Sequence, residues 1–199
     1  MDLDILKRGF KLVEYIYDNA DKFPTHRVKE VGNGLSEKHW IGKQWLVDEL
    51  SPYIFNHNIH VAAGWLGLTS YLLRKEFSNN KIINSDRDAG CKDMGEYLFH
   101  EHDISFEVRD TVIDVPICDV YINTSIEHIN QLSVEHILQS LKPKTIVALQ
   151  SNNYYKVEDH VNCCKDLQEF KDKTNLSKVY YTGEMPFENH DRYMIIGEV

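Results

Sequence analysis

A run of polar side chains, Asn123-Thr124-Ser125-Ile126-Glu127-His128, directly follows a short apolar segment at residues 120–122. Glu127 or His128 could accept a proton from a substrate hydroxyl or amine, because carboxylates and imidazoles both serve as general bases. Alternatively, Ser125 caps a following helix, and Glu127 and His128 are solvated residues of its first turn. We predict that Glu127 and His128 are catalytic and that Ser125 contacts the substrate.

A second polar group, Asn152, Asn153 and Tyr154, follows the apolar segment at residues 145–149 and suits hydrogen bonding to a substrate. Two glycines, Gly64 and Gly67, follow another apolar segment at 59–63. Glycine permits a positive φ and lets a ligand approach the bare backbone amides. This polar group could equally be an ordinary loop, and the glycines could belong to a simple turn.

Asp86 follows the expected strand at 81–85, roughly 20 residues after the glycines. This is the spacing at which a carboxylate meets ribose hydroxyls in dinucleotide-type sites. Asp110 follows the segment 105–108 in the same way. Ligands of open α/β sheets bind at the carboxyl ends of the strands. The positions of these acids therefore predict a nucleotide-like cofactor, although both could instead be turn residues.

Short apolar segments alternate with stretches of helical periodicity, which predicts an α/β fold. We expect strands at 59–63, 81–85, 105–108, 119–122, 145–149, 177–181 and 192–197, and helices at 4–19, 36–50, 68–77, 89–99, 132–141 and 157–170. Residues 23–34 are expected to form a loop because they contain Pro24, Gly32 and Gly34. The prediction is a three-layer sandwich around a mostly parallel seven-stranded sheet.

The last two expected strands are separated by a short loop that cannot hold a helix, so they must pair as an antiparallel hairpin. Residues 1–57 are expected to form a helical cap that belongs to the same domain as the sheet at 58–199. Trp40 and Trp45 in this cap are expected to pack in the core or in a lid.

This order of elements resembles the class I S-adenosylmethionine-dependent methyltransferase family over residues 58–199. The resemblance implies that the first loop wraps the methionine part of the cofactor, that Asp86 binds its ribose and that Asp110 meets its adenine. The predicted cofactor-binding residues are Ala63, Gly64, Trp65, Gly67, Asp86, Arg87, Asp110, Thr111 and Asn123.

The loop departs from the family pattern of three alternating glycines preceded by an acid. Ala63 and Trp65 occupy two of the glycine positions, and Val61 stands in place of the acid. Ala63 fits if its φ is negative, with Gly64 supplying the flexibility nearby, and the carbonyl oxygen of Asn123 could hold the cofactor's ammonium. The bulky Trp65 could also pack an ordinary turn between a strand and a helix.

The resemblance implies methyl transfer from S-adenosylmethionine to an oxygen or nitrogen atom of a small-molecule acceptor. Two alternatives remain open, namely another nucleotide-cofactor enzyme such as an NAD-dependent oxidoreductase, and a non-catalytic methyltransferase-like binding module. The hairpin and the absence of a GxGxxG loop argue against the oxidoreductase. The polar run also lacks the Asp/Asn-Pro-Pro-aromatic sequence used to methylate base amines.

The formal net charge of −9 argues against a duplex nucleic-acid partner, because phosphate contacts require a basic face. Four cysteines without a CxxC pair indicate scattered thiols, and the absence of a signal peptide or an apolar span predicts a cytoplasmic protein without membrane contact. His160 and Cys164 could supply only two metal ligands, so no metal site is predicted, and residues 158–164 are expected to be a helix face with buried thiols.

Overall fold

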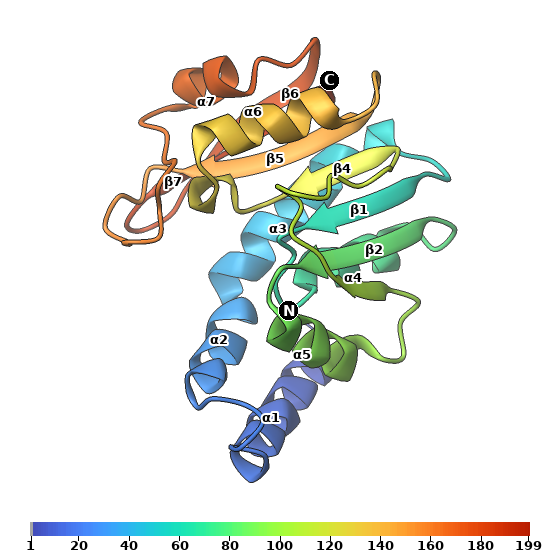
Figure 1. Ribbon diagram of the computed structural model, residues 1–199, viewed down its shortest axis with the longest axis vertical. Coiled ribbons are helices and arrows are strands. Elements are labelled where there is room, and N and C mark those ends of the chain that lie inside the picture. Colours follow the sequence, from blue (N-terminus) through green and yellow to red (C-terminus); the bar gives the residue numbers. More distant parts are fainter. Residues whose placement is uncertain (1) are drawn as a thin grey trace.

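The computed structural model describes residues 2–199 and contains a seven-stranded sheet in the order β3-β2-β1-β4-β5-β7-β6 (Figure 1). The strands are β1 (Asn58–Ala62), β2 (Lys81–Asp86), β3 (Ser105–Val108), β4 (Val120–Asn123), β5 (Ile146–Asn152), β6 (Lys178–Pro186) and β7 (Asp191–Glu198). Strands β1 to β5 pair in parallel, whereas β7 runs antiparallel to both β5 and β6. The predicted α/β fold and its terminal hairpin are confirmed.

Helices cover both faces of this sheet (Figure 1). They are α1 (Leu3–Asp18), α2 (His26–Gly34), α3 (Glu37–Leu50), α4 (Leu68–Glu76), α5 (Ala89–Phe99), α6 (Gln131–Ser140) and α7 (Leu167–Thr174), with short 3₁₀ turns η1 (Ser51–Tyr53) and η2 (Ile126–His128). Helices α1 to α5 contribute to one hydrophobic core, and α6 and α7 contribute to a second core on the other side.

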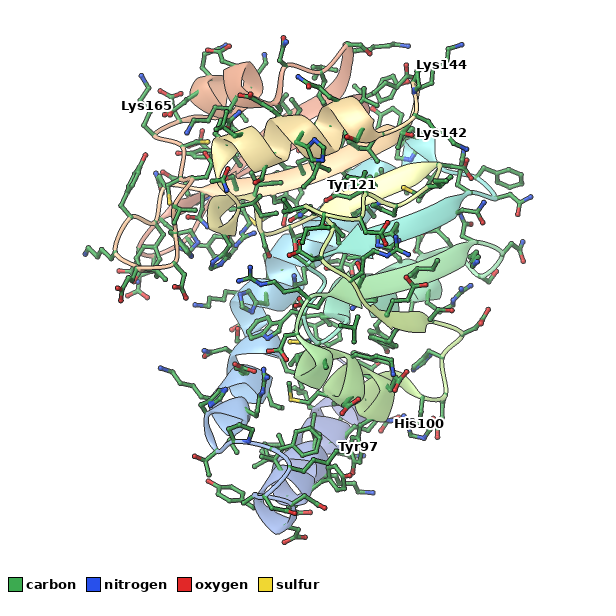
Figure 2. All side chains as sticks on the ribbon, viewed as in Figure 1. Tyr97, His100, Tyr121, Lys142, Lys144 and Lys165 are labelled. Atoms are coloured by element: carbon green, nitrogen blue, oxygen red, sulfur yellow. The ribbon has the colours of Figure 1, made fainter. Side chains whose placement is uncertain are left out.

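Alternating side chains of the strands supply the two cores. In β7, Met194 and Ile196 belong to the core beneath α1–α5, whereas Tyr193 and Ile195 belong to the core beneath α6 and α7. Tyr121 of β4 likewise lies on the α6 side (Figure 2). Successive residues of a strand point to opposite faces, so a sheet covered on both faces needs apolar residues at nearly every position. This explains the nearly continuous apolar runs in the central part of the sheet, in β4, β5 and β7.

The expected loop at 23–34 is wrong, because residues His26–Gly34 form α2. Helix α2 packs on α1 through the buried Val31, and the leucine that follows it contacts Gly9 so closely that a Cβ there would lie 2.6 Å from Leu35 Cδ1. Tertiary packing therefore stabilises a helix that contains two glycines and has weak intrinsic propensity.

The expected helix at 157–170 is also wrong in its first ten residues, because α7 begins only at Leu167. The backbone amides of Asn162 and Cys164 donate to the carbonyl oxygens of Glu127 and Asn152 instead of to residues four positions earlier. Asp166 then caps α7 by accepting a hydrogen bond from the amide of Glu169. The segment before α7 is thus a loop tied to the carboxyl ends of β4 and β5, and it carries the buried thiols of Cys163 and Cys164.

Strand β5 extends three residues beyond the expected end at residue 149, through Gln150, Ser151 and Asn152. Their pairing with β7 places Asn152 opposite Arg192. Helix α3 crosses the carboxyl edge of the sheet, toward which β1 and β4 point (Figure 1). The side-chain amide of Gln150 donates through Nε2 to the Gly42 carbonyl at 2.8 Å, which fixes α3 above β5.

The helices among residues 2–199 are too short or too polar to cross a membrane.

Candidate functional site

The loop between β1 and α4 adopts a left-handed backbone at three alternating residues. The φ angles are 47° at Ala63, 49° at Trp65 and 89° at Gly67. The conformation costs a non-glycine residue about 1–2 kcal/mol, and such strain is typical of functional sites. The condition stated for Ala63, a negative φ, is not met: the loop has a left-handed backbone at all three alternating positions although two of the glycines are replaced.

Gly64 is needed for space rather than for a left-handed backbone. A Cβ at this position would lie 2.7 Å from Asn84 Cγ and still closer to Asn84 Oδ1. Asn84 is itself buried, accepts a hydrogen bond from Ser70 Oγ at 2.8 Å and donates to the Trp65 carbonyl at 3.4 Å. Asn84 thus links β2, α4 and the loop, and it leaves no room for a side chain at Gly64.

Asp86 lies beside this loop at the end of β2. Its Oδ2 accepts from the Trp65 amide and its Oδ1 accepts from the Asp88 amide, each at 3.1 Å. Burial raises the pKa of this half-buried carboxyl, and the two backbone hydrogen bonds oppose the shift. Each oxygen accepts one bond from the backbone and keeps a lone pair for a further donor. Asp86 therefore fits a ligand that presents hydroxyl groups.

The other predicted cofactor residues lie along the same edge of the sheet. Asp110 is half-buried and accepts from the Val112 amide at 3.0 Å, Thr111 is buried, and Arg87 is exposed. Asn123 is fully buried, and its Oδ1 accepts from the Ser125 amide at 2.9 Å. Asn123 thus shapes the turn after β4.

Glu127 lies at the centre of a buried polar group at the ends of β4 and β5. It is 3% exposed, and its Oε1 accepts from Asn152 Nδ2 at 2.7 Å and lies 3.7 Å from Arg192 Nη2. Its Oε2 has no hydrogen-bond partner among residues 2–199. A buried, unpartnered carboxylate oxygen is costly, so such an atom points to a missing ligand. The pairing of β5 with β7 brings Asn152 and Arg192 together at this carboxylate.

Lys43, which was not among the predicted site residues, reaches this group from α3. Its amine donates to Thr124 Oγ1 at 3.1 Å. Removal from water and then the nearby charge of Arg192 lower the pKa of Lys43 to about 7. A lysine of this kind can exchange a proton near neutral pH and is a candidate functional residue. The signal in the sequence was weak, since Lys43 is one of several charged residues of α3.

The remaining predicted residues lie on the outer side of Glu127. His128 is exposed, and its ring contacts that of His160 with 4.6 Å between centroids. The Tyr154 amide donates to Asn152 Oδ1 at 2.9 Å, and Ser125 immediately precedes η2. The side chain of Asn153 makes three hydrogen bonds of 2.8–3.0 Å to Asp191 and Tyr193. Asn153 therefore connects the end of β5 to β7.

Two surface hollows lie away from this edge. One, of about 610 Å³, lies between α6, α7 and the last residue. The other, of about 570 Å³, lies between α1 and α5 and includes Tyr97 and His100 (Figure 2). The predicted residues instead lie along the carboxyl edge of the sheet, after β1 to β5.

Solved structures share this architecture. Magnesium protoporphyrin IX methyltransferase from Synechocystis PCC 6803, with bound S-adenosylmethionine, superimposes with a TM-score of 0.65 at 12% identity over 96% of both chains. The N-methyltransferase NodS from Bradyrhizobium japonicum WM9 has a TM-score of 0.63 at 9% identity over 83% of this chain and 98% of its own.

The pyocyanin biosynthetic protein PhzM has a TM-score of 0.64 at 12% identity over 92% of this chain, which spans only 61% of PhzM's length. No protein-family model matches the sequence, and no curated protein matches it. The similarity is therefore one of fold. From its strand order and its structural neighbours, the chain has the fold of the class I S-adenosylmethionine-dependent methyltransferases.

Proposed function

We propose that the protein transfers a methyl group from S-adenosylmethionine to an oxygen or nitrogen atom of a small-molecule acceptor. The observation that carries this proposal is the left-handed backbone at Ala63, Trp65 and Gly67, combined with the Asp86 carboxylate that is hydrogen-bonded to the middle residue. The structural similarity to NodS and to magnesium protoporphyrin IX methyltransferase, the latter with bound S-adenosylmethionine, supports it at the level of fold.

The residues present fit this cofactor. Asp86 keeps lone pairs for two ribose hydroxyls, and the strained loop presents its backbone at the end of β1. The proposed cofactor-binding residues are Ala63, Gly64, Trp65, Gly67, Asp86, Arg87, Asp110, Thr111 and Asn123. The cofactor supplies an electrophilic methyl group on a sulfonium, and the task of the protein is to hold the acceptor in line with it.

The acceptor would lie beneath α3, beside the ends of β4 and β5. Ser125, Asn152, Asn153 and Tyr154 are the proposed substrate-binding residues. Glu127 and His128 are the proposed acid–base residues, and Lys43 is a further candidate because its lowered pKa of about 7 leaves part of it neutral. The N-terminal helices would cover the cofactor and complete the acceptor pocket.

Calorimetric titration with S-adenosylhomocysteine, S-adenosylmethionine and NAD tests the cofactor class. We expect both adenosyl ligands to bind and NAD not to bind. Asp86→Asn should weaken S-adenosylhomocysteine about 10- to 100-fold, because hydrogen bonds to a charged group contribute about 1.5–3 kcal/mol each. Asp103→Asn is the matched control, since this aspartate has a 96% exposed side chain.

Folding of each variant is verified by circular dichroism and thermal unfolding. A folded wild-type protein that binds neither adenosyl ligand would refute the proposal. Binding of NAD instead would favour an oxidoreductase. Unchanged affinity in Asp86→Asn would remove Asp86 from the cofactor site, whatever the ligand.

A further inference from the structure

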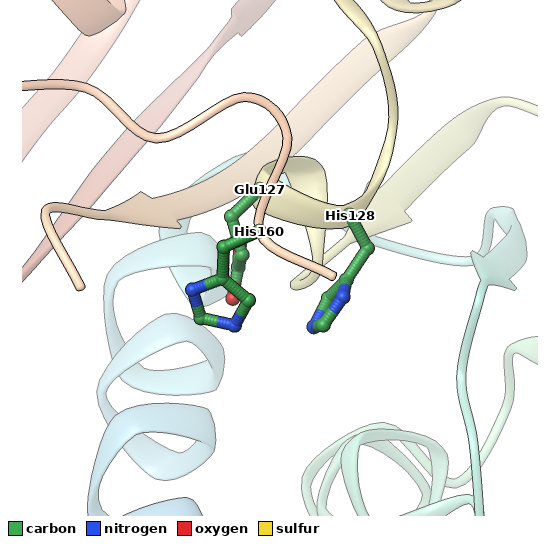
Figure 3. A group of neighbouring side chains, drawn as sticks. All are labelled: Glu127, His128 and His160. Atoms are coloured by element: carbon green, nitrogen blue, oxygen red, sulfur yellow. The ribbon is translucent and has the colours of Figure 1, made fainter. Parts of the chain in front are cut away.

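Three potential metal ligands come together at the outer end of the Glu127 group. Glu127 and His128 lie in η2, and His160 lies in the loop before α7 (Figure 3). One ligand atom from each residue lies within 4.8 Å of the other two. In the helix expected at 157–170, His160 would lie on one face with Cys164. The observed loop instead directs His160 toward His128.

The Glu127 carboxylate provides a second, independent observation. The residue is 3% exposed, and its Oε2 makes no hydrogen bond within the described part of the chain. Asn152 and Arg192 both contact the other oxygen, Oε1. The protein therefore positions one carboxylate oxygen with its partners and leaves the other free for a ligand.

His160 is oriented as metal-binding histidines usually are. Its Nδ1–H donates to the Tyr154 carbonyl at 2.8 Å. This hydrogen bond places the proton on Nδ1, so the lone pair of Nε2 is available to a metal ion. A backbone carbonyl that holds the other ring nitrogen is a common outer partner of a metal ligand, because it fixes both tautomer and ring orientation.

We propose that Glu127, His128 and His160 bind one divalent transition-metal ion through a carboxylate oxygen and two imidazole nitrogens. Two histidines and one glutamate form a known ligand set for Zn²⁺ with an open coordination position. Imidazole ligands also disfavour Mg²⁺ and Ca²⁺, which prefer oxygen.

Binding requires only small side-chain movements. Zn²⁺ holds its nitrogen and oxygen ligands at about 2.0–2.2 Å, so ligand atoms on one ion lie no more than about 4.4 Å apart. His128 is exposed, so its ring is able to rotate toward Glu127 and His160, whereas His160 stays on the Tyr154 carbonyl. The positive charges of Arg192 and Lys43 oppose a cation, but the contact of Arg192 is with Oε1 and the amine of Lys43 is held by Thr124.

The role of this ion rests on the proposed function. A metal with an open position beside the acceptor would lower the pKa of an acceptor hydroxyl, whose proton would pass to water. Glu127 and His128 would then act on the acceptor through the ion rather than as free bases.

The experiment uses the full chain, freed of metal with a chelator and titrated with Zn²⁺ in competition with a chromogenic chelator. It is done without S-adenosylmethionine. We expect one ion per chain and a rise in the unfolding temperature. Glu127→Gln, His128→Gln and His160→Gln should each weaken binding at least tenfold. His136→Gln on the exposed side of α6 is the control for adventitious histidine binding.

The variants at exposed His128 and half-buried His160 are expected to fold, which keeps the test decisive if Glu127→Gln unfolds. Absence of stoichiometric binding, or wild-type affinity in both histidine variants, would overturn the proposal. S-adenosylhomocysteine affinity is measured separately on the metal-free protein. A protein that binds S-adenosylhomocysteine but not Zn²⁺ contradicts only the metal site, and one that binds Zn²⁺ but not S-adenosylhomocysteine contradicts only the proposed function.

Discussion

Replacing Gly64 by alanine tests whether the first loop is held by Asn84. The new methyl group would lie 2.7 Å from Asn84 Cγ, so the amide must move. Overpacking a buried site costs about 1–3 kcal/mol. Displacing Asn84 also breaks its buried hydrogen bond with Ser70, which adds about 1 kcal/mol. We expect Gly64→Ala to lower the free energy of unfolding by about 2–4 kcal/mol.

The matched control is Gly32→Ala, because a Cβ at Gly32 meets no atom within 4 Å and this exposed residue lies inside α2. Alanine in a helix is favoured over glycine by about 1 kcal/mol, so this variant should be slightly stabilised. Urea unfolding followed by circular dichroism measures the free energy of unfolding of both variants. An unchanged dependence of this free energy on urea concentration would show that the unfolding transitions are comparable. A Gly64→Ala protein within about 0.5 kcal/mol of wild type would refute the role given to Asn84.

Two further predictions concern protonation. If Lys43 is the general base that removes the proton of the methyl acceptor, the methyl-transfer rate should rise with pH through about 7, the lowered pKa of the lysine amine. Lys43→Met should abolish this pH dependence and reduce kcat roughly 100-fold. A rate–pH profile of unchanged shape in this variant would exclude Lys43 as the base. Burial lowers the pKa of His60 from 6.5 to about 4. Between these two pH values the unfolded chain therefore binds more protons than the folded chain. The free energy of unfolding should fall by about 3 kcal/mol as the pH decreases through this range. Urea midpoints at several pH values should therefore vary less for His60→Gln than for wild type, and equal slopes would contradict this assignment.

The candidate site could be predicted only in part. Asp86, Glu127 and Asn152 were recognisable because polar residues that follow apolar strands must lie at the carboxyl edge of a parallel sheet. Lys43, Arg192 and His160 were not, because each comes from an element that is distant in sequence. Their position depends on how α3, β7 and the loop before α7 pack against that edge.

The loop after β1 shows the same division. Its sequence contains Ala63 and Trp65 where a left-handed backbone would call for glycine, so local preference argued against the conformation that the chain adopts. Hydrogen bonds from the Trp65 amide to Asp86 and from Asn84 to the Trp65 carbonyl hold the backbone there. These contacts cross from β2 and cannot be read from the loop itself.

The sequence by itself determined the seven strands, their alternation with helices and the antiparallel hairpin, because apolar periodicity and loop length are local properties. Only the tertiary structure decided that residues His26–Gly34 are helical, that residues 157–166 are not, and that Glu127, His128 and His160 meet. In the first two cases contacts between distant segments outweigh local helix propensity, which amounts to only a few tenths of a kcal/mol per residue. The third depends on how the loop before α7 is tied to η2 and β5.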